Sequence, residues 1–191
     1  MSQLLHNSLS FTHELIKKTV KPGDTVIDAT VGNGGDTLLL ADLVGEKGNV
    51  IGFDIQNTAI ANTTEKLENH NLEDRVSLHQ TGHEYLLSVY SKPESVSVIV
   101  FNLGYLPTGD KRIITSPDTT LKAIESGLSV LKKNGLVLIM IYYGHDGGLD
   151  EKEAVLNYVR SLPQTHYNVL KYDFINQKNN PPFLLAIEKR K

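Results

Sequence analysis

Short apolar runs alternate with segments of helical periodicity along most of the chain. The runs that favour strands cover residues 24–30, 49–55, 75–80, 95–103 and 135–143. Segments that favour helices begin near residue 35 and cover residues 58–69 and 117–132. This alternation predicts parallel βαβ units, and the unbroken run LVLIMIYY at 136–143 is typical of a strand that is covered on both faces.

The helix over 117–132 has the clearest boundary signals. Ser116 stands before it as a candidate N-cap, and Pro117 takes the first helical position, where a missing backbone N–H is tolerated. The pair Asn134-Gly135 is a stop signal at the other end.

The last two strand-like segments, residues 166–175 and 182–190, are separated by only about six residues. That distance is too short for a crossover helix, so the two strands should pair antiparallel as a hairpin. We therefore expect an α/β fold with about seven strands, mostly parallel, an antiparallel C-terminal hairpin and helices on both faces. The length suits a single domain over residues 1–191.

Composition narrows the classes of protein and chemistry. Hydrophobic residues make up 40% of the chain, and no apolar run approaches the roughly 20 residues of a membrane span, so we expect a cytoplasmic protein. The chain has no cysteine, which excludes disulfides, thiolate nucleophiles and iron–sulfur clusters. A net charge of −3 does not indicate a large nucleic-acid-binding surface, although a local basic patch is compatible with it.

A glycine-rich turn, GNGGD, follows the first strand. Gly32 and Gly34 supply the backbone freedom that a sharp turn beside a ligand requires. The turn is not a P-loop, and Thr37 stands where a dinucleotide fingerprint needs a small residue. Asp28 and Asp36 flank the turn and would repel a pyrophosphate, but Asp28 can organise the loop or receive a cationic ammonium group.

A second acid, Asp54, closes the next strand 22 residues beyond Gly32. A carboxylate at this place can accept hydrogen bonds from both ribose hydroxyls of an adenosine. Both NAD and S-adenosylmethionine contain that ribose, so Asp54 indicates an adenosine without deciding between the two cofactors.

The order of these motifs resembles the class I S-adenosylmethionine-dependent methyltransferases, with TGHE at 81–84 in the adenine position and FNLGYLP after the fourth strand. The segments IDATVGNGGDT, FNLGYLPTGDK and NNPPFLLAIEK are similar to a bacterial family formerly labelled rRNA methylases. That resemblance implies a methyltransferase acting on the amine of 5-aminomethyl-2-thiouridine at the tRNA wobble position. The expected cofactor ligands are Asp28, Gly32, Asn33, Gly34, Asp36, Thr37, Asp54, Gln56, Gly82, His83 and Glu84.

Methyl transfer needs an unprotonated amine held in line with the methyl donor. Asn102 is the candidate for orienting this amine through its side-chain carbonyl, and Tyr105 could stack on the uracil. This stretch echoes the Asn-Pro-Pro-Tyr motif of amino methyltransferases, but Leu103 and Gly104 replace the two prolines.

Substrate contacts are expected from His145, and from Lys111 and Arg112 as phosphate ligands, with Lys17, Lys18 and Lys21 adding to them if the N-terminal helix lies nearby. His6 and His13 could also face the substrate side. The residues at 145–151 lack a second histidine at a useful interval, so we expect no metal.

Three other readings stay open on sequence alone. An rRNA or small-molecule N- or O-methyltransferase shares every motif, an NAD-dependent oxidoreductase is disfavoured by Asp28 and Thr37, and a non-catalytic RNA-binding protein would keep the pocket without turnover. The oligomeric state is not readable from the sequence, and a homodimer would be unsurprising.

Overall fold

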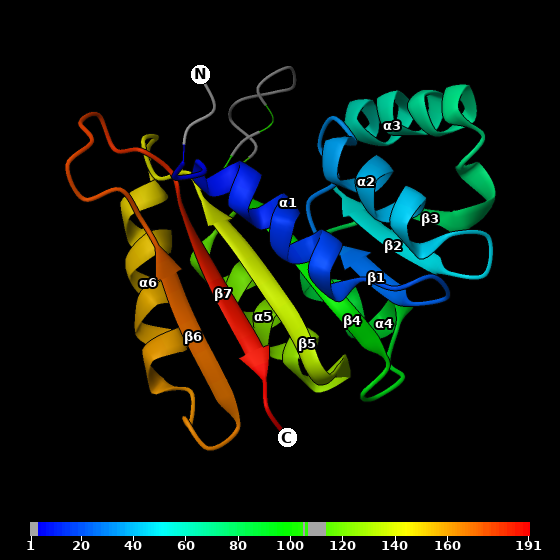
Figure 1. The fold of residues 1–191 in the computed structure, drawn as a ribbon. Helices are drawn as coiled ribbons and strands as arrows, with labels where there is room; N and C mark the ends of the chain where they lie inside the picture. Colours follow the sequence, from blue (N-terminus) through cyan, green and yellow to red (C-terminus); the bar gives the residue numbers. More distant parts are fainter. Residues whose placement is uncertain (1–3, 105, 107–113) are drawn as a thin grey trace.

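A computed structural model describes residues 4–104, 106 and 114–191, which form a seven-stranded sheet in the order β3-β2-β1-β4-β5-β7-β6 (Figure 1). The strands are β1 (Thr25–Asp28), β2 (Asn49–Asp54), β3 (Val76–Gln80), β4 (Val96–Leu103), β5 (Leu131–Ile141), β6 (Tyr167–Tyr172) and β7 (Phe183–Lys189). The helices are α1 (Ser8–Thr19), α2 (Gly35–Val44), α3 (Asn57–His70), α4 (Leu86–Val89), α5 (Pro117–Val130) and α6 (Gly148–Ser161), with short 3-10 turns η1 (Glu73–Arg75) and η2 (His83–Tyr85).

Strands β1 to β5 pair in parallel, and the expected C-terminal hairpin is present because β6 pairs antiparallel with β7. The hairpin adds to the sheet through β7, which also pairs antiparallel with β5. The predicted α/β class, the mostly parallel sheet and the antiparallel end are therefore confirmed.

Alternate residues of the central strands enter two separate apolar cores. On β4, Val98 and Val100 pack with α1, α2 and α3, whereas Ile99 and Phe101 pack with α5 and α6. Figure 1 shows α1, α2 and α3 on the near face of the sheet and α5 on the far face. Because both faces are covered, the central strands read as unbroken apolar runs.

Helix α1 begins at an Asn7 cap, whose side chain accepts from the Ser10 N–H at 2.8 Å. Its first turn is attached to the C-terminal hairpin, because the Ser8 hydroxyl donates to the Pro182 carbonyl (3.2 Å) and the rings of Phe11 and Tyr172 stack with centroids 4.3 Å apart. The first and last elements of the chain thus support each other.

The boundaries differ from the predictions in three places. Helix α5 ends at Val130, and β5 begins at once with an irregular register, so residues 131–135 belong to the strand. Ser116 takes the N-cap position, but its hydroxyl contacts that of Thr119 (2.9 Å) instead of capping a backbone amide. Helix α6 was not predicted, although its start carries the acidic residues Asp150 and Glu151 in the first turn.

Within the part of the chain that the structure describes, no helix combines the length and the apolar character needed to cross a bilayer.

The central position of β5 gives a stability prediction. Leu138 is fully buried in the core that the sheet shares with α1 and α2, and Leu138→Ala should lower the free energy of unfolding by about 3 kcal/mol through lost contacts and a residual cavity. Urea denaturation followed by circular dichroism measures this change. Leu170→Ala on the edge strand β6, where the side chain is 48% exposed, is the control and should cost less than about 1 kcal/mol; equal losses would contradict the assigned core.

Candidate active site

A pocket of about 800 Å³ opens at the carboxyl ends of the parallel strands, the upper edge of the sheet in Figure 1. This is the edge where open α/β sheets hold ligands. Its wall includes residues from the turn after β1, the ends of β2 and β4, the segment after β5, and the N-terminal helix. The volume lies in the upper range for small-molecule sites, which leaves room for a cofactor beside a second reactant.

The glycine turn is fixed from below. Gly34 is the N-cap of α2 in a left-handed conformation (φ +76°), and a Cβ at this residue would lie 2.7 Å from the Thr63 hydroxyl. That hydroxyl donates to the Gly32 carbonyl (3.3 Å), while the Gly32 N–H donates to Asp54 (2.9 Å). Gly34 therefore serves the close approach of α3 and does not itself line the pocket.

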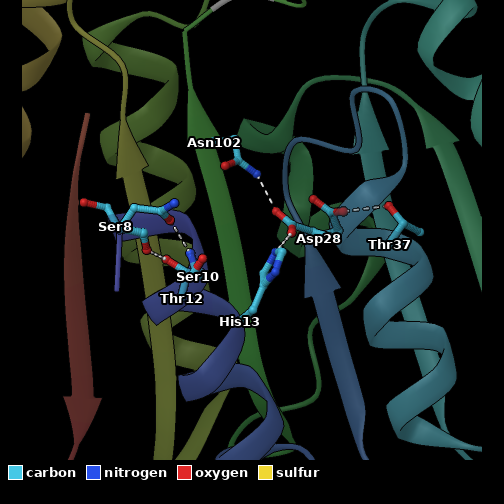
Figure 2. A network of polar contacts seen from close by, with 9 residues as sticks. Ser8, Ser10, Thr12, His13, Asp28, Thr37 and Asn102 are labelled. Carbon is cyan, nitrogen blue, oxygen red and sulfur yellow. Dashed lines mark hydrogen bonds and ion pairs between the residues drawn. The ribbon is translucent and has the colours of Figure 1, made fainter. Parts of the chain in front are cut away.

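Asp28 lies fully buried beneath the turn and organises it. One carboxylate oxygen accepts from the Thr37 hydroxyl (2.6 Å; Figure 2) and the other from the Thr30 N–H (3.2 Å). Neither Asp28 nor Thr37 is among the residues that line the pocket. Of the two roles considered for Asp28, the geometry supports loop organisation over direct contact with a ligand.

Burial and, after it, the negative charge of nearby Asp36 raise the pKa of Asp28 to about 7, against the hydrogen bonds from Thr37 and Thr30, which lower it. The folded protein thus holds this proton more tightly than the unfolded chain does.

The second-strand acid and the TGHE segment line the adjoining part of the pocket. Asp54 accepts the backbone N–H groups of Gly32 and Gln56, each at 2.9 Å. His83 is buried on Phe101, with its Nδ1 3.2 Å from the Ala29 carbonyl; because a carbonyl only accepts, Nδ1 carries the proton. Burial lowers the pKa of His83, so the ring is neutral at pH 7.

Asn102 ends β4 at the pocket wall and is held at two points. Its backbone N–H donates to the Thr30 hydroxyl (2.6 Å), and its side-chain NH₂ donates to Asp36 Oδ2 (2.8 Å). Asp36 Oδ1 lies 2.7 Å from His13 Nε2 of α1. Figure 2 shows the His13 ring rising from α1 toward this point, below the Asn102 amide.

The opposite wall follows β5. Tyr142, Tyr143 and His145 line the pocket, and His145 Nδ1 lies 2.9 Å from the Asp146 carbonyl. Gly104 packs against this wall at φ +146°, where a Cβ would come within 3.3 Å of the Tyr142 Cβ.

A buried acid supports the same wall. Glu151 accepts from the hydroxyls of Thr115 (2.7 Å) and Thr120 (2.6 Å), and the Gly104 N–H donates to Thr115 (2.9 Å). This chain of bonds joins the end of β4 to α5 and α6.

The structure brings most of the expected site residues to one pocket: Gly32, Asn33, Asp36, Asp54, Gln56, Gly82, His83, Glu84, Asn102 and His145 all line it. Tyr105, Lys111 and Arg112 lie outside the described residues. Tyr142 and Tyr143 line the pocket but were not predicted to do so, because their apolar run looks like the end of a buried strand. Gly144, which follows them, indicates that the strand ends there and that the two tyrosines stand at its edge.

None of the lysines of the N-terminal segment lines this pocket. Lys17 and Lys18 belong to the last turn of α1, and the Lys21 N–H donates to Asp24 (2.8 Å), just before β1 begins. They therefore lie at the amino end of the sheet, whereas the pocket lies at its carboxyl end.

Comparison with known proteins decides the family. A family described as "Putative rRNA methylase" matches residues 50–188. A tRNA (mnm(5)s(2)U34)-methyltransferase from the chloroplast of Arabidopsis thaliana is 35% identical over 93% of this chain and 68% of its own length. The chain belongs to this methyltransferase family.

Solved structures agree with this assignment. A "putative rRNA-methylase" from Clostridium thermocellum is 50% identical, with a TM-score of 0.95 over 98% of this chain and 100% of that chain. A "putative methyltransferase" from Streptococcus mutans, in complex with SAH, is 40% identical, with a TM-score of 0.89 over 97% and 99% of the two chains. We conclude that the cofactor of the present chain is S-adenosylmethionine.

The donor set fits that cofactor. The pocket offers a carboxylate at the end of β2 and a neutral histidine after β3, and the sequence of its glycine turn lacks the Gly-Lys-Ser/Thr of a P-loop. Among the described residues, no group of three or more metal-ligating side chains lies close enough to hold a metal ion.

The raised pKa of Asp28 makes stability depend on pH. The carboxyl of the unfolded chain titrates near 3.8, so the stabilisation from its proton is complete below about pH 4 and is lost as the pH rises through 7. Asp28→Asn cannot ionise and should lack this loss. Between pH 4 and 8, the unfolding free energy of the variant should gain on the order of 3–4 kcal/mol relative to wild type.

Urea denaturation at several pH values measures this difference. Asp42→Asn, which removes an exposed carboxyl from α2, is the control for the loss of one negative charge. A difference between Asp28→Asn and wild type that stays constant over this pH range would contradict the assignment.

Proposed function

We propose that this methyltransferase transfers a methyl group to the primary amine of 5-aminomethyl-2-thiouridine at the wobble position of tRNA. The observation that carries the proposal is Asn102, whose side chain reaches the pocket at the end of β4 with its NH₂ committed to Asp36. The amide carbonyl is then the group available to accept a hydrogen bond from an amine. The named activity of the Arabidopsis relative supports the same substrate.

The reaction needs orientation more than a protein nucleophile. S-adenosylmethionine supplies an electrophilic methyl group on a sulfonium. An amine with a free lone pair forms the N–CH₃ bond as the S–CH₃ bond breaks, so the substrate ammonium must first give up one proton, and the product carries the positive charge. Asn102 Oδ1 accepts one N–H of the neutral amine and directs the lone pair along the line of attack.

The cofactor assignments extend this proposal to the other side of the pocket. Asp54 binds the ribose hydroxyls with the lone pairs that its two backbone amides leave, and Gln56 lies beside it. Gly82, His83 and Glu84 surround the adenine, while Gly32 and Asn33 face the amino-acid portion. Asp28, Gly34 and Thr37 support this part of the site from below.

The substrate side completes the proposal. His145 contacts the nucleotide, Tyr105 stacks on the base, and Lys111 with Arg112 binds anticodon phosphates. We also propose that residues 1–191 act as one methyltransferase domain, because the described site residues line one pocket at the carboxyl edge of a single sheet. The location we propose for this domain is the cytoplasm.

The ribose assignment gives a binding prediction. Hydrogen bonds to a charged group contribute about 1.5–3 kcal/mol, so Asp54→Ala should raise the Kd for S-adenosylhomocysteine by about 10–100-fold. Isothermal titration calorimetry measures this change. Asp42→Ala, at an exposed carboxyl on α2, is the matched control and should leave the Kd unchanged; unaltered binding by Asp54→Ala would refute the assignment.

Mass spectrometry of nucleosides tests the substrate. A strain without this gene should accumulate the unmethylated 5-aminomethyl-2-thiouridine in its tRNA, and purified enzyme with S-adenosylmethionine should convert that tRNA to the methylated form. Asn102→Ala should fail to restore the modification although it still binds S-adenosylhomocysteine. If the deletion strain has unchanged tRNA nucleosides but lacks a methyl group in its rRNA, the substrate is rRNA and the proposal is wrong.

A further inference from the structure

The contacts of Asp36 give this side chain a role that differs from cofactor binding. Both of its carboxylate oxygens are engaged, Oδ2 by the Asn102 NH₂ (2.8 Å) and Oδ1 by His13 Nε2 (2.7 Å). The Asp36 side chain is only 10% exposed, and it stands in the first turn of α2, where the helix dipole favours a negative charge.

An ionised carboxylate fixes the orientation of a neighbouring amide. It only accepts hydrogen bonds, so Asn102 must point its NH₂ at Asp36 and its carbonyl oxygen away from it. Figure 2 shows the Asn102 amide in this arrangement, with its nitrogen on the dashed line and its oxygen on the other side. A neutral partner that could also donate would permit either orientation.

His13 holds the second oxygen of Asp36. Because that oxygen only accepts, Nε2 of the ring carries the proton and donates it. The ring comes from α1, whose first turn is attached to the C-terminal hairpin through the Ser8–Pro182 hydrogen bond and the Phe11–Tyr172 stack. The carboxylate is thus held from an element that lies outside the βαβ units.

The charge of Asp36 also reaches its neighbours. It contributes to the raised pKa values of Asp28, below the turn, and of Tyr142, across the pocket, in both cases after the larger effect of burial.

We infer that Asp36 and His13 are positioning residues that lock the Asn102 amide with its carbonyl oxygen toward the acceptor amine. This inference rests on the proposed function for its chemistry. It also means that the N-terminal helix contributes a residue, His13, to the active site. The chain His13–Asp36–Asn102 acts on the direction of the amine and leaves affinity for the cofactor almost unchanged.

Nuclear magnetic resonance tests the lock without any substrate. In ¹⁵N-labelled wild type, the Asn102 side-chain NH₂ pair, identified by its loss in Asn102→Asp, should show one proton shifted downfield and protected from exchange with water. Asp36→Asn and His13→Ala should remove this signature. Lys17→Ala, an exposed site one turn along α1 from His13, should keep it. An unshifted, freely exchanging pair in wild type would overturn the inference.

Kinetics with tRNA that carries 5-aminomethyl-2-thiouridine test the consequence. Asp36→Asn should lower kcat by about 10–100-fold and His13→Ala by about 5–10-fold, since small displacements of reacting groups are costly. The Kd for S-adenosylhomocysteine should stay within about threefold of wild type. His13→Gln, which keeps an N–H donor, should recover part of the activity lost in His13→Ala.

The outcomes distinguish the positioning role of Asp36 from the proposed tRNA substrate. A cofactor Kd that rises more than about tenfold in Asp36→Asn, with kcat unchanged, would make Asp36 a cofactor ligand and overturn the positioning role. No turnover of this tRNA by the wild-type enzyme would refute the proposed substrate. The resonance experiment would still show whether Asp36 and His13 hold the Asn102 amide in one orientation. Thermal denaturation of each variant establishes that it is folded. If Asp36→Asn is unstable, the His13 variants give a second readout, because the His13 side chain is 33% exposed.

Discussion

The structure depends on the coverage of one sheet on both faces. A strand such as β4, which sends Val98 to one apolar core and Ile99 to the other, has no face left for polar side chains. Polar chemistry is therefore confined to the ends of the strands, where Asp28, Asp54 and Asn102 stand at the carboxyl edge. The parallel direction of β1, β2 and β4 brings these three ends to the same place.

Three carboxylates around one turn give the site its electrostatic character. Asp28 is buried under the loop, Asp54 holds the turn through its backbone amides, and Asp36 stands at the start of α2. A pyrophosphate in this position would meet like charge, whereas the sulfonium of S-adenosylmethionine brings positive charge. The raised pKa of Asp28 reflects first its burial and then the negative charge of Asp36.

Much of this architecture could be predicted from local patterns. The strand order in the sequence, the hairpin and the helix at Pro117 follow from periodicity and turn residues, and the glycine turn and Asp54 line one pocket, as their pattern indicated. The partners of each side chain could not be predicted in the same way. Asp36 was assigned to the cofactor because it follows the glycines, and only the packing of α1 shows that it faces His13 and Asn102.

Helix α6 and the Tyr142 wall illustrate the same limit. The short, glycine-rich segment at 144–148 hides the start of the helix, and the aromatic pair after β5 looks like a continuation of the core. The position of α6 beside this wall is set by contacts over long sequence separations, such as the hydrogen bonds that join Glu151 to Thr115 and Thr120.

The position of β7 affects how the chain reaches its native state. This strand is synthesised after β6, yet it lies between β5 and β6, so the edge of β5 stays unpaired until residues 183–189 are available. Until then the nascent polypeptide exposes a long apolar strand edge, which is a template for intermolecular pairing. Insertion of the final strand closes this edge, and it also provides the surface on which the first turn of α1 docks. The attachment of the first turn of α1 therefore depends on segments at the very end of the chain.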